Sequence, residues 1–434
     1  MKIATPNDLE NHGPRQTNAA NYKWGEIDGN VFSERINRAY EEVVRFRKNL
    51  FLLPSGSVGN WYVTEKAKFF EAMVSQHPME KIAMKALSVM EHLLLQRASQ
   101  DSTTKRNKEL LTERIALWEK GDIDQLTTTA MAIQERLETH RKKMNDEELA
   151  RKFARFMFTG RIRDALTLLE KHGERSSALK LTRQVQKTLA ALHPEPGDFD
   201  QEVLLDGNIP PVDPVLFEPI TEQLISKAVL ELQGSHGPSG GDAAHWKRLT
   251  LSFGCKSKRL REAMAKFARR MCTERMDPEV LEAFLANRLV AIDKCPGVRP
   301  VGIGEAPRRI IGKGIVKVLK KDIQMAAGSY NLCAGQAVGI EALIHAMIEA
   351  FELMSTEAAF LADASNAFNR LNRKVALWNI QYICPPLTIV LYNTYGHPTR
   401  MFVLGGFELS SKEGTTQGCP LAMAMYALGV IPLI

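Results

Sequence analysis

The sequence predicts an α+β fold in which a helical N-terminal domain precedes a domain of mixed helices and strands. From residue 62 to about residue 192, apolar residues recur three and four positions apart, a spacing typical of amphipathic helices. Two proline-rich segments, 193–198 and 209–214, then disfavour helix and indicate a boundary. After this boundary, helical patterns alternate with short apolar runs bounded by turn residues, which favours strands among helices.

These observations divide the chain into four parts. Residues 1–60 form a loosely structured lead-in with one possible helix at 34–50. Residues 61–192 form the helical N-terminal domain, 193–219 form a proline-rich linker, and 220–434 form the mixed domain.

The composition is that of a globular protein with a basic surface. Hydrophobic residues make up 44% and charged residues 25% of the 434 positions, which argues against a wholly disordered chain. The formal net charge of +7 favours a polyanionic partner such as nucleic acid, although a solvated basic surface explains it equally well.

The six cysteines include no C-x-x-C pair, so neither a disulfide framework nor a zinc ribbon is indicated. With no secretory signal and no apolar run of bilayer length in the sequence, we expect an intracellular protein, nuclear or cytoplasmic, without a membrane partner.

The N-terminal helical region carries basic clusters and large aromatic residues. The clusters are 141–143; Arg151, Lys152 and Arg155; and Arg161 and Arg163. They are able to contact phosphates, but the charged outer faces of packed helices have the same composition, and we favour that second interpretation. We expect Trp118 and Phe158 to lie in the core.

The mixed domain is expected to begin with a helix at 221–232, capped by the hydroxyl of Thr221. A glycine-rich loop follows at 234–242. It lacks the G-K-[ST] ending of a Walker motif and is therefore a weak signal for phosphate binding. Apolar spacing then predicts helices at 258–271 and 278–287.

A strand at 289–292 and a turn at 294–297 lead to a strand, turn and helix at 298–313. This last segment carries four cations, Arg299, Arg308, Arg309 and Lys313. Basic residues on a rigid ribbon offset the charge of a triphosphate, and arginine is able to bind its oxygens in a bidentate manner. A basic helix start with no ligand explains the same residues equally well.

A single carboxylate stands out in the following segment. An amphipathic helix is predicted at 339–351, with its apolar residues inward, and an apolar run of buried-strand type follows at 358–362. Asp363 comes directly after this run. Because a carboxylate at the end of a buried strand is held rigidly, as a metal site requires, we predict that Asp363 is a catalytic metal ligand.

Beyond Asp363, a helix at 377–395 is interrupted by prolines, and a hairpin is predicted at 400–409. Three short patterns then stand in order along the chain: R-P-x-x-I from Arg299, D-x-x-x-A-F-N at 363–369, and Q-G-x-P from Gln417. Together they resemble the fingers and palm motifs of reverse transcriptases, most closely those of non-long-terminal-repeat retroelements.

The resemblance covers roughly residue 209 to the end and implies a partial right-hand polymerase, fingers and palm. It implies an RNA-directed DNA polymerase that takes an RNA template, a DNA primer and dNTP. Asp363 and the carbonyl of Ala364 would hold Mg²⁺ or Mn²⁺ in two-metal nucleotidyl transfer. Phe368 would be the gate under the sugar, Gln417 and Gly418 would contact the template, and Arg299 would lead the triphosphate contacts. Arg308, Arg309 and Lys313 would share a second basic role.

The sequence departs from this family in two respects, and the smaller one is Ala422 after the Q-G-x-P pattern, where many relatives have serine. Two-metal catalysis needs a second carboxylate, yet after Asp363 the only acidic residues are Glu408 and Glu413, both before the Q-G-x-P pattern. We therefore expect a polymerase truncated after that pattern and inactive as this chain, with an exposed apolar helix at 421–434. The alternative is a non-catalytic nucleic-acid-binding relic of the same fold.

Overall fold

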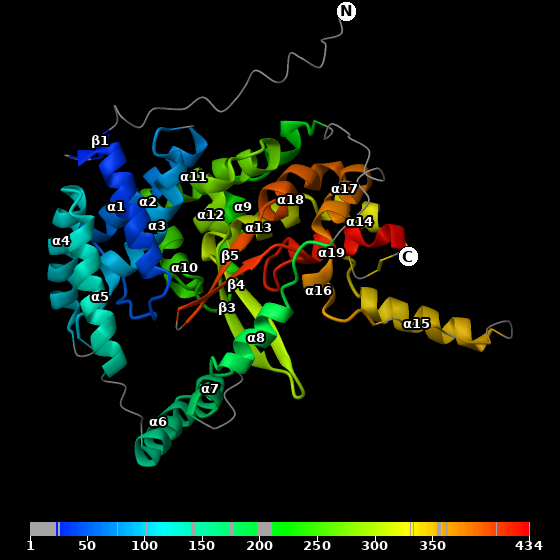
Figure 1. The fold of residues 1–434 in the computed structure, drawn as a ribbon, viewed down its shortest axis with the longest axis horizontal. Coiled ribbons are helices and arrows are strands. Elements are labelled where there is room, and N and C mark those ends of the chain that lie inside the picture. The colour runs from blue at the N-terminus through cyan, green and yellow to red at the C-terminus, as the bar shows by residue number, and fades with distance from the viewer. Residues whose placement is uncertain are drawn as a thin grey trace, which may run out of the picture.

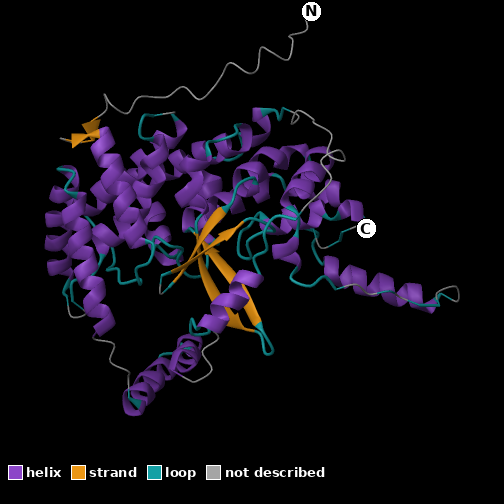
Figure 2. Cartoon of the chain, in the orientation of Figure 1, coloured by secondary structure: helices purple, strands orange, loops and turns teal. Residues whose placement is uncertain are grey.

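The computed structural model has a mixed α+β fold, as predicted, with many helices around one small sheet (Figure 2). The structure describes residues 23–24, 27–75, 77–99, 102–139, 145–172, 178–197, 211–329, 331–332, 334–353, 357–358, 360, 363–404 and 406–433. None of the described helices combines the length and the apolar character that a bilayer span requires.

A two-stranded ribbon, β1 (Lys23–Trp24) and β2 (Ile27–Asp28), precedes the first helices. These helices are α1 (Gly29–Val43), α2 (Ser57–Val74), α3 (Glu80–Leu95), α4 (Thr104–Glu119) and α5 (Ile123–Thr139). The helix predicted at 34–50 is α1, which begins earlier because the carboxylate of Asp28 accepts from the amide of Asn30 at 2.8 Å. Trp118 is fully buried, as predicted.

The next three helices are α6 (Asp146–Phe158), α7 (Ile162–His172) and α8 (Arg183–Ala191). Gly160, with φ of 69°, lies at the turn between α6 and α7. The prediction that Phe158 lies in the core is wrong, because its side chain is 91% exposed at the end of α6. Helical spacing marks an apolar face but does not reveal what covers it.

The mixed domain opens with a short 3-10 helix, Pro214–Phe217, followed by α9 (Glu222–Leu230), α10 (Ala243–Leu251), α11 (Gly254–Thr273) and α12 (Pro278–Leu285). The predicted cap is confirmed, since the hydroxyl of Thr221 accepts from the amide of Leu224. Apolar contacts join α2 to α11, and the ring centres of Phe70 and Phe267 lie 5.8 Å apart. Helices on both sides of the predicted linker therefore share one core, which runs from Phe32 to Leu428.

The sheet has the strand order β4-β3-β5-β6. Its strands are β3 (Asn287–Asp293), β4 (Val298–Gly304), β5 (Thr399–Val403) and β6 (Phe407–Ser411), which confirms the predicted strand and the predicted hairpin. Both hairpins are antiparallel, whereas β3 and β5 run parallel, with Asn287 opposite Met401. Figure 1 shows α8 beside this sheet, and Leu189 packs there in a second, smaller core.

The remaining helices are α13 (Ala306–Val318), α14 (Lys320–Ala327), α15 (Gly339–Glu352), α16 (Ala367–Arg370), α17 (Arg373–Ile383), α18 (Thr388–Tyr395) and α19 (Ala422–Gly429). Short 3-10 helices, Pro385–Leu387 and Ile431–Leu433, lie before α18 and after α19. The predicted proline interruption between α17 and α18 is confirmed.

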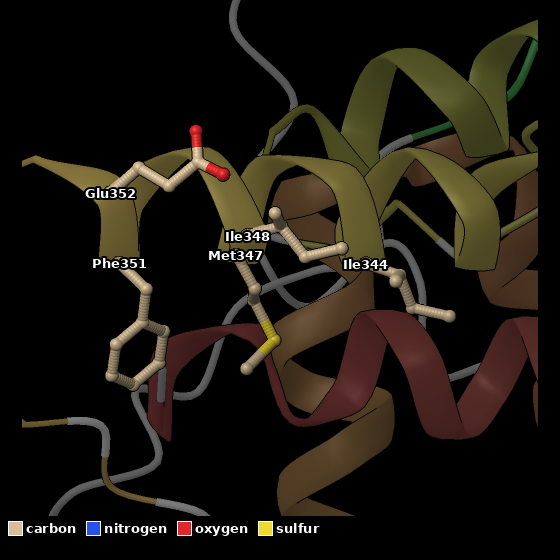
Figure 3. Close-up of a pocket in the computed structure, with 5 residues that line it drawn as sticks. All are labelled: Ile344, Met347, Ile348, Phe351 and Glu352. Atoms are coloured by element: carbon tan, nitrogen blue, oxygen red, sulfur yellow. The ribbon is translucent and has the colours of Figure 1, made fainter.

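Helix α15 forms as predicted, but its apolar side does not face inward. It projects from the rest of the molecule in Figure 1, and Ile344 and Phe351 are each 51% exposed. Figure 3 shows Met347 and Phe351 on one side of the helix and Glu352 on the other, with a pocket against the apolar side. The amphipathic pattern predicted the helix correctly. The expectation that its apolar side packs inward is wrong.

The prediction that the last apolar helix is exposed is wrong for α19. Met425 and Leu428 are fully buried. The end of the helix lies so close to α17 that a Cβ on Gly429 would be 2.8 Å from the Cβ of Ala376. Asn379 on α17 donates to the carbonyl of Gly429 at 3.0 Å. The apolar surface expected in solvent is thus largely used to pack α19 on α17, with Met423 and Leu433 exposed.

Candidate functional site

The loop at 414–420 packs directly on β4 and α13. A Cβ on Gly302 of β4 would lie 2.5 Å from the Thr416 methyl group, and one on Gly418 would lie 3.0 Å from the carbonyl of Gly302. On α13, a Cβ on Gly312 would lie 3.3 Å from the ring of Pro420. The strand that carries R-P-x-x-I and the turn that carries Q-G-x-P are therefore in contact.

The 363–371 segment meets the beginning of the same loop. Thr415 donates its amide to the carbonyl of Phe368 at 2.5 Å, and Gly414 donates to the carbonyl of Leu371 at 2.8 Å. The ring of Phe368 is half-buried and lies 4.9 Å from that of Tyr426 on α19. All three sequence patterns thus contribute residues around the 414–420 loop.

A buried arginine that the sequence reasoning missed fixes this loop. Arg373 donates from Nε to the carbonyl of Gly414 at 2.7 Å and from Nη1 to the carbonyl of Ser411 at 2.9 Å. Its own amide donates to Glu413 at 2.8 Å, and burial lowers the pKa of Arg373 to about 10. A signal was present, because a cation in the first turn of a helix opposes the helix dipole and needs another reason to be there.

Asp363 and Ala364 are both exposed. The buried strand expected before them is not observed: Phe360 is 93% exposed, while Ala359, Leu361 and Ala362 lie outside the described residues. A strand is held by a neighbouring strand, and the described sheet contains no strand from this segment. Across the described ranges, no group of three or more His, Cys, Asp or Glu side chains is placed to hold a metal ion.

The predicted triphosphate cations divide into buried and accessible residues. Arg309 donates to the carbonyls of Gln233 at 2.9 Å and Ser235 at 2.6 Å. Arg308 donates from Nη1 to the carbonyl of Leu285 at 2.9 Å and is 4% exposed. Both guanidinium groups are held inside the protein rather than presented to a ligand.

Arg299 is exposed on β4, where it stands opposite Ile292 of β3. Lys313 is half-buried on α13 and donates to the carbonyl of Glu231 at 3.0 Å. On the 414–420 loop, Gln417 is half-buried and Gly418 is exposed. Arg299, Gln417 and Gly418 are therefore reachable from solvent, as are the exposed Asp363 and Ala364.

The glycine-rich loop at 234–242 is held by two charged groups, the buried Glu305 and the half-buried Arg288. Glu305, the residue before α13, accepts from the amide and the hydroxyl of Ser239, each at 2.7 Å. Arg288 on β3 donates to the carbonyl of His236 at 3.0 Å. Burial raises the pKa of Glu305 to about 7. Because the Ser239 amide is already bonded to Glu305, the loop has a structural role here. No sequence pattern pointed to Glu305.

A buried ion pair lies next to the glycine-rich loop. Lys66 on α2 and Glu91 on α3 are both fully buried, with 2.7 Å between Nζ and Oε2. Burial lowers the pKa of Lys66, which Glu91 opposes, and burial lowers the pKa of the neighbouring His92 to about 4. Asp242 at the end of the loop pairs with Lys48. The N-terminal helices and the glycine-rich loop are thus linked by charge as well as by apolar packing.

Comparison with known protein families and with curated proteins finds no match for this chain.

Proposed function

We propose that this chain is the fingers and partial palm of an RNA-directed DNA polymerase of the non-long-terminal-repeat retroelement type. One observation carries the proposal: β4 and the 363–371 segment, which hold two of the family patterns, both contact the 414–420 loop, which holds the third. These segments are far apart in the sequence, and contact between them is what a shared active site requires.

Within this proposal, the accessible residues take the ligand contacts. Gln417 and the exposed Gly418 contact the template, and a glycine at φ of 101° allows close backbone approach. Arg299 meets the triphosphate. Phe368 remains the residue proposed to lie under the sugar, whereas the buried Arg308 and Arg309 support the proposal by holding α13 in place.

The proposed cofactor is Mg²⁺ or Mn²⁺, and the described residues do not by themselves form a complete site for it. Asp363 supplies one carboxylate and Ala364 one carbonyl, and neither belongs to a cluster of metal-binding side chains in the described ranges. Two-metal transfer needs a further carboxylate. The proposal therefore assigns Asp363 as one ligand and requires a second from outside these residues.

Primer extension tests this proposal. The enzyme is this chain in a longer form that carries an Asp-Asp hairpin, with an RNA template, a DNA primer and dNTP. Asp363→Asn is expected to lower incorporation by at least about a hundredfold, because it removes a charge that the metal needs. The matched control is Asp293→Asn, an exposed carboxylate on β3 that is expected to leave the rate unchanged. Equal rates for Asp363→Asn and the parent protein would show that the metal assignment is wrong.

A second candidate function is a non-catalytic nucleic-acid-binding relic of the same fold. The exposed position of Asp363, outside any described metal-binding cluster, favours it. In that case the protein binds RNA with an affinity that falls as salt rises, and Arg299→Gln weakens binding in all sequences alike. Neither the chain nor its longer form would then incorporate dNTP, which separates the two candidates.

A further inference from the structure

Arg308 carries a buried charge that no described carboxylate neutralises. Its Nη1 donates to the carbonyl of Leu285 and to Asn287, but its Nε and Nη2 have no hydrogen-bond partner. The residue is 4% exposed and forms no ion pair within the described part of the chain. Unpaired N–H groups on a buried cation are costly, so this position favours an anion.

Cys419, on the loop that packs against α13, is a group in this region that is able to become that anion. Pro420 packs on Gly312, which lies one helical turn after Arg308 on α13, so the loop brings Cys419, the preceding residue, to this part of α13. Burial alone would lower the pKa of Arg308, but the facing groups of Cys419 and Tyr395 raise it. The Cys419 sulfur does not complete hydrogen-bond geometry with Arg308, which leaves Nε and Nη2 free to bind an added oxygen.

The surroundings are rich in unpaired donors. The guanidinium of Arg308 lies 5.9 Å and that of Arg373 5.5 Å from the centre of the Tyr395 ring. The hydroxyls of Tyr395 and Thr416 are buried and also lack partners. Cys419 itself is half-buried, so part of the residue is exposed to solvent.

We propose that Cys419 is a modification site, oxidised by hydrogen peroxide or a small organic peroxide to a sulfinate that Arg308 binds. In the first step, one peroxide transfers an oxygen atom to the thiol, giving a sulfenic acid and releasing water or an alcohol. A second peroxide gives the sulfinic acid in the same way, and its proton passes to solvent. Each step oxidises the sulfur by two electrons and reduces one peroxide, so no further reactant is needed.

The product differs from the thiol in charge and in acceptor number. Its two oxygens match the unpaired Nε and Nη2 of Arg308, and charge-assisted bonds of this kind are the strong ones. Oxidation would therefore fasten the turn at Gln417 and Gly418 to α13. An effect on template handling rests on the proposed function, whereas the oxidation itself does not.

Peroxide treatment of the full chain, followed by peptide mass spectrometry, tests the chemistry directly. Cys255 and Cys295 are exposed and serve as internal controls. Sulfinate at Cys419 is expected to accumulate several-fold faster than at either control, although Cys419 is less exposed. Oxidation that follows exposure, with Cys255 and Cys295 at or ahead of Cys419, would overturn the proposal.

A second pair of variants tests the anion position without any oxidant. Cys419→Asp and Cys419→Asn have the same shape and differ in charge. If the buried Arg308 favours an anion at position 419, the Asp variant is expected to have an unfolding temperature about 2–4 °C above that of the Asn variant. An Asp form that unfolds at or below the Asn form would refute the role of Arg308. Primer extension plays no part in either test, so failure here is distinct from failure of the polymerase proposal.

Discussion

Gly414 lies where two of the three sequence patterns touch. Its φ of 67° belongs to the left-handed region, and a Cβ there would lie 2.2 Å from the carbonyl of Phe368. That overlap involves backbone on both sides, so a rotamer change cannot relieve it. The residue therefore fixes the distance between the 363–371 segment and the 414–420 loop.

Replacing Gly414 with alanine is expected to lower the free energy of unfolding by about 3 kcal/mol or more, since backbone strain and a steric clash add. Gly406→Ala is the matched control, because Gly406 has φ of 89° but no atom within 4 Å of its Cβ position. The control should lose about 1 kcal/mol, from backbone strain alone. Urea unfolding of both variants measures the difference, and equal losses would mean that the two segments do not touch as described.

At the level of elements, the contact between α2 and α11 joins the two predicted domains. Phe70 on α2 is fully buried against Phe267 on α11, and Phe267 in turn lies 5.3 Å from Phe284 on α12. These helices come from opposite sides of the predicted linker at 193–219. The division into two domains stays a prediction from the sequence. In the structure, one hydrophobic core includes helices from both sides of the linker.

Phe70→Ala is expected to cost about 3–5 kcal/mol, through lost burial and a cavity between α2 and α11. Because one core spans both regions, helix content and the fluorescence of the buried Trp246 should change in a single transition at a lower denaturant concentration. Phe158→Ala, which alters a 91% exposed ring, is the control and should leave the midpoint unchanged. Two separate transitions would contradict a shared core.

Elements with strong local signals were predicted well. The cap at Thr221, the proline break before α18 and the β5–β6 hairpin each depend on neighbouring residues and were all confirmed. The run at 358–362 and the inner face of α15 depend on what lies beside them, and there the predictions were wrong or fell partly outside the described residues. Local sequence specifies an element more closely than it specifies the partner of that element.

On the scale of the whole molecule, buried ionisable groups make stability depend on pH in a predictable direction. The pKa of Glu305 is raised from 4.5 to about 7 in the fold. A raised carboxyl pKa stabilises the folded state below the unfolded value, and this contribution is lost as pH rises from about 4.5 to about 7. His92, with its pKa lowered from 6.5 to about 4, acts in the opposite direction. Its contribution to the stability of the folded state is lost as pH falls from about 6.5 to about 4.

Glu305→Gln isolates the first of these effects, because the amide does not titrate between pH 4 and 8. Its oxygen is able to accept from the Ser239 N–H and its NH2 group to donate to the Ser239 hydroxyl, so both contacts are retained. The parent protein should lose stability relative to this variant between pH 4.5 and 7, by on the order of 3 kcal/mol. Unfolding midpoints at several pH values give the comparison. A constant difference across this range would show that Glu305 titrates normally.

The candidate site could be predicted from the sequence only in outline. The patterns at Arg299, 363–369 and Gln417 led to segments that do meet in the fold, whereas the residues that hold them together did not stand out. Arg373 and Glu305 act through burial and through carbonyl and hydroxyl partners that are distant in the sequence. Their roles depend on three-dimensional packing, which single-residue patterns do not encode.

The parallel pairing of β3 with β5 also has a consequence for the order in which the chain acquires its structure. The β3–β4 hairpin forms from adjacent residues, but its parallel neighbour arrives roughly a hundred residues later, on the order of ten seconds during synthesis. Until then, the β3 edge that Met401 and Phe402 will occupy stays open on the ribosome. Closing such a distant pair is slow, and an unpaired strand edge attracts other chains, so this edge is where a newly made chain is most exposed to wrong pairing before β5 arrives.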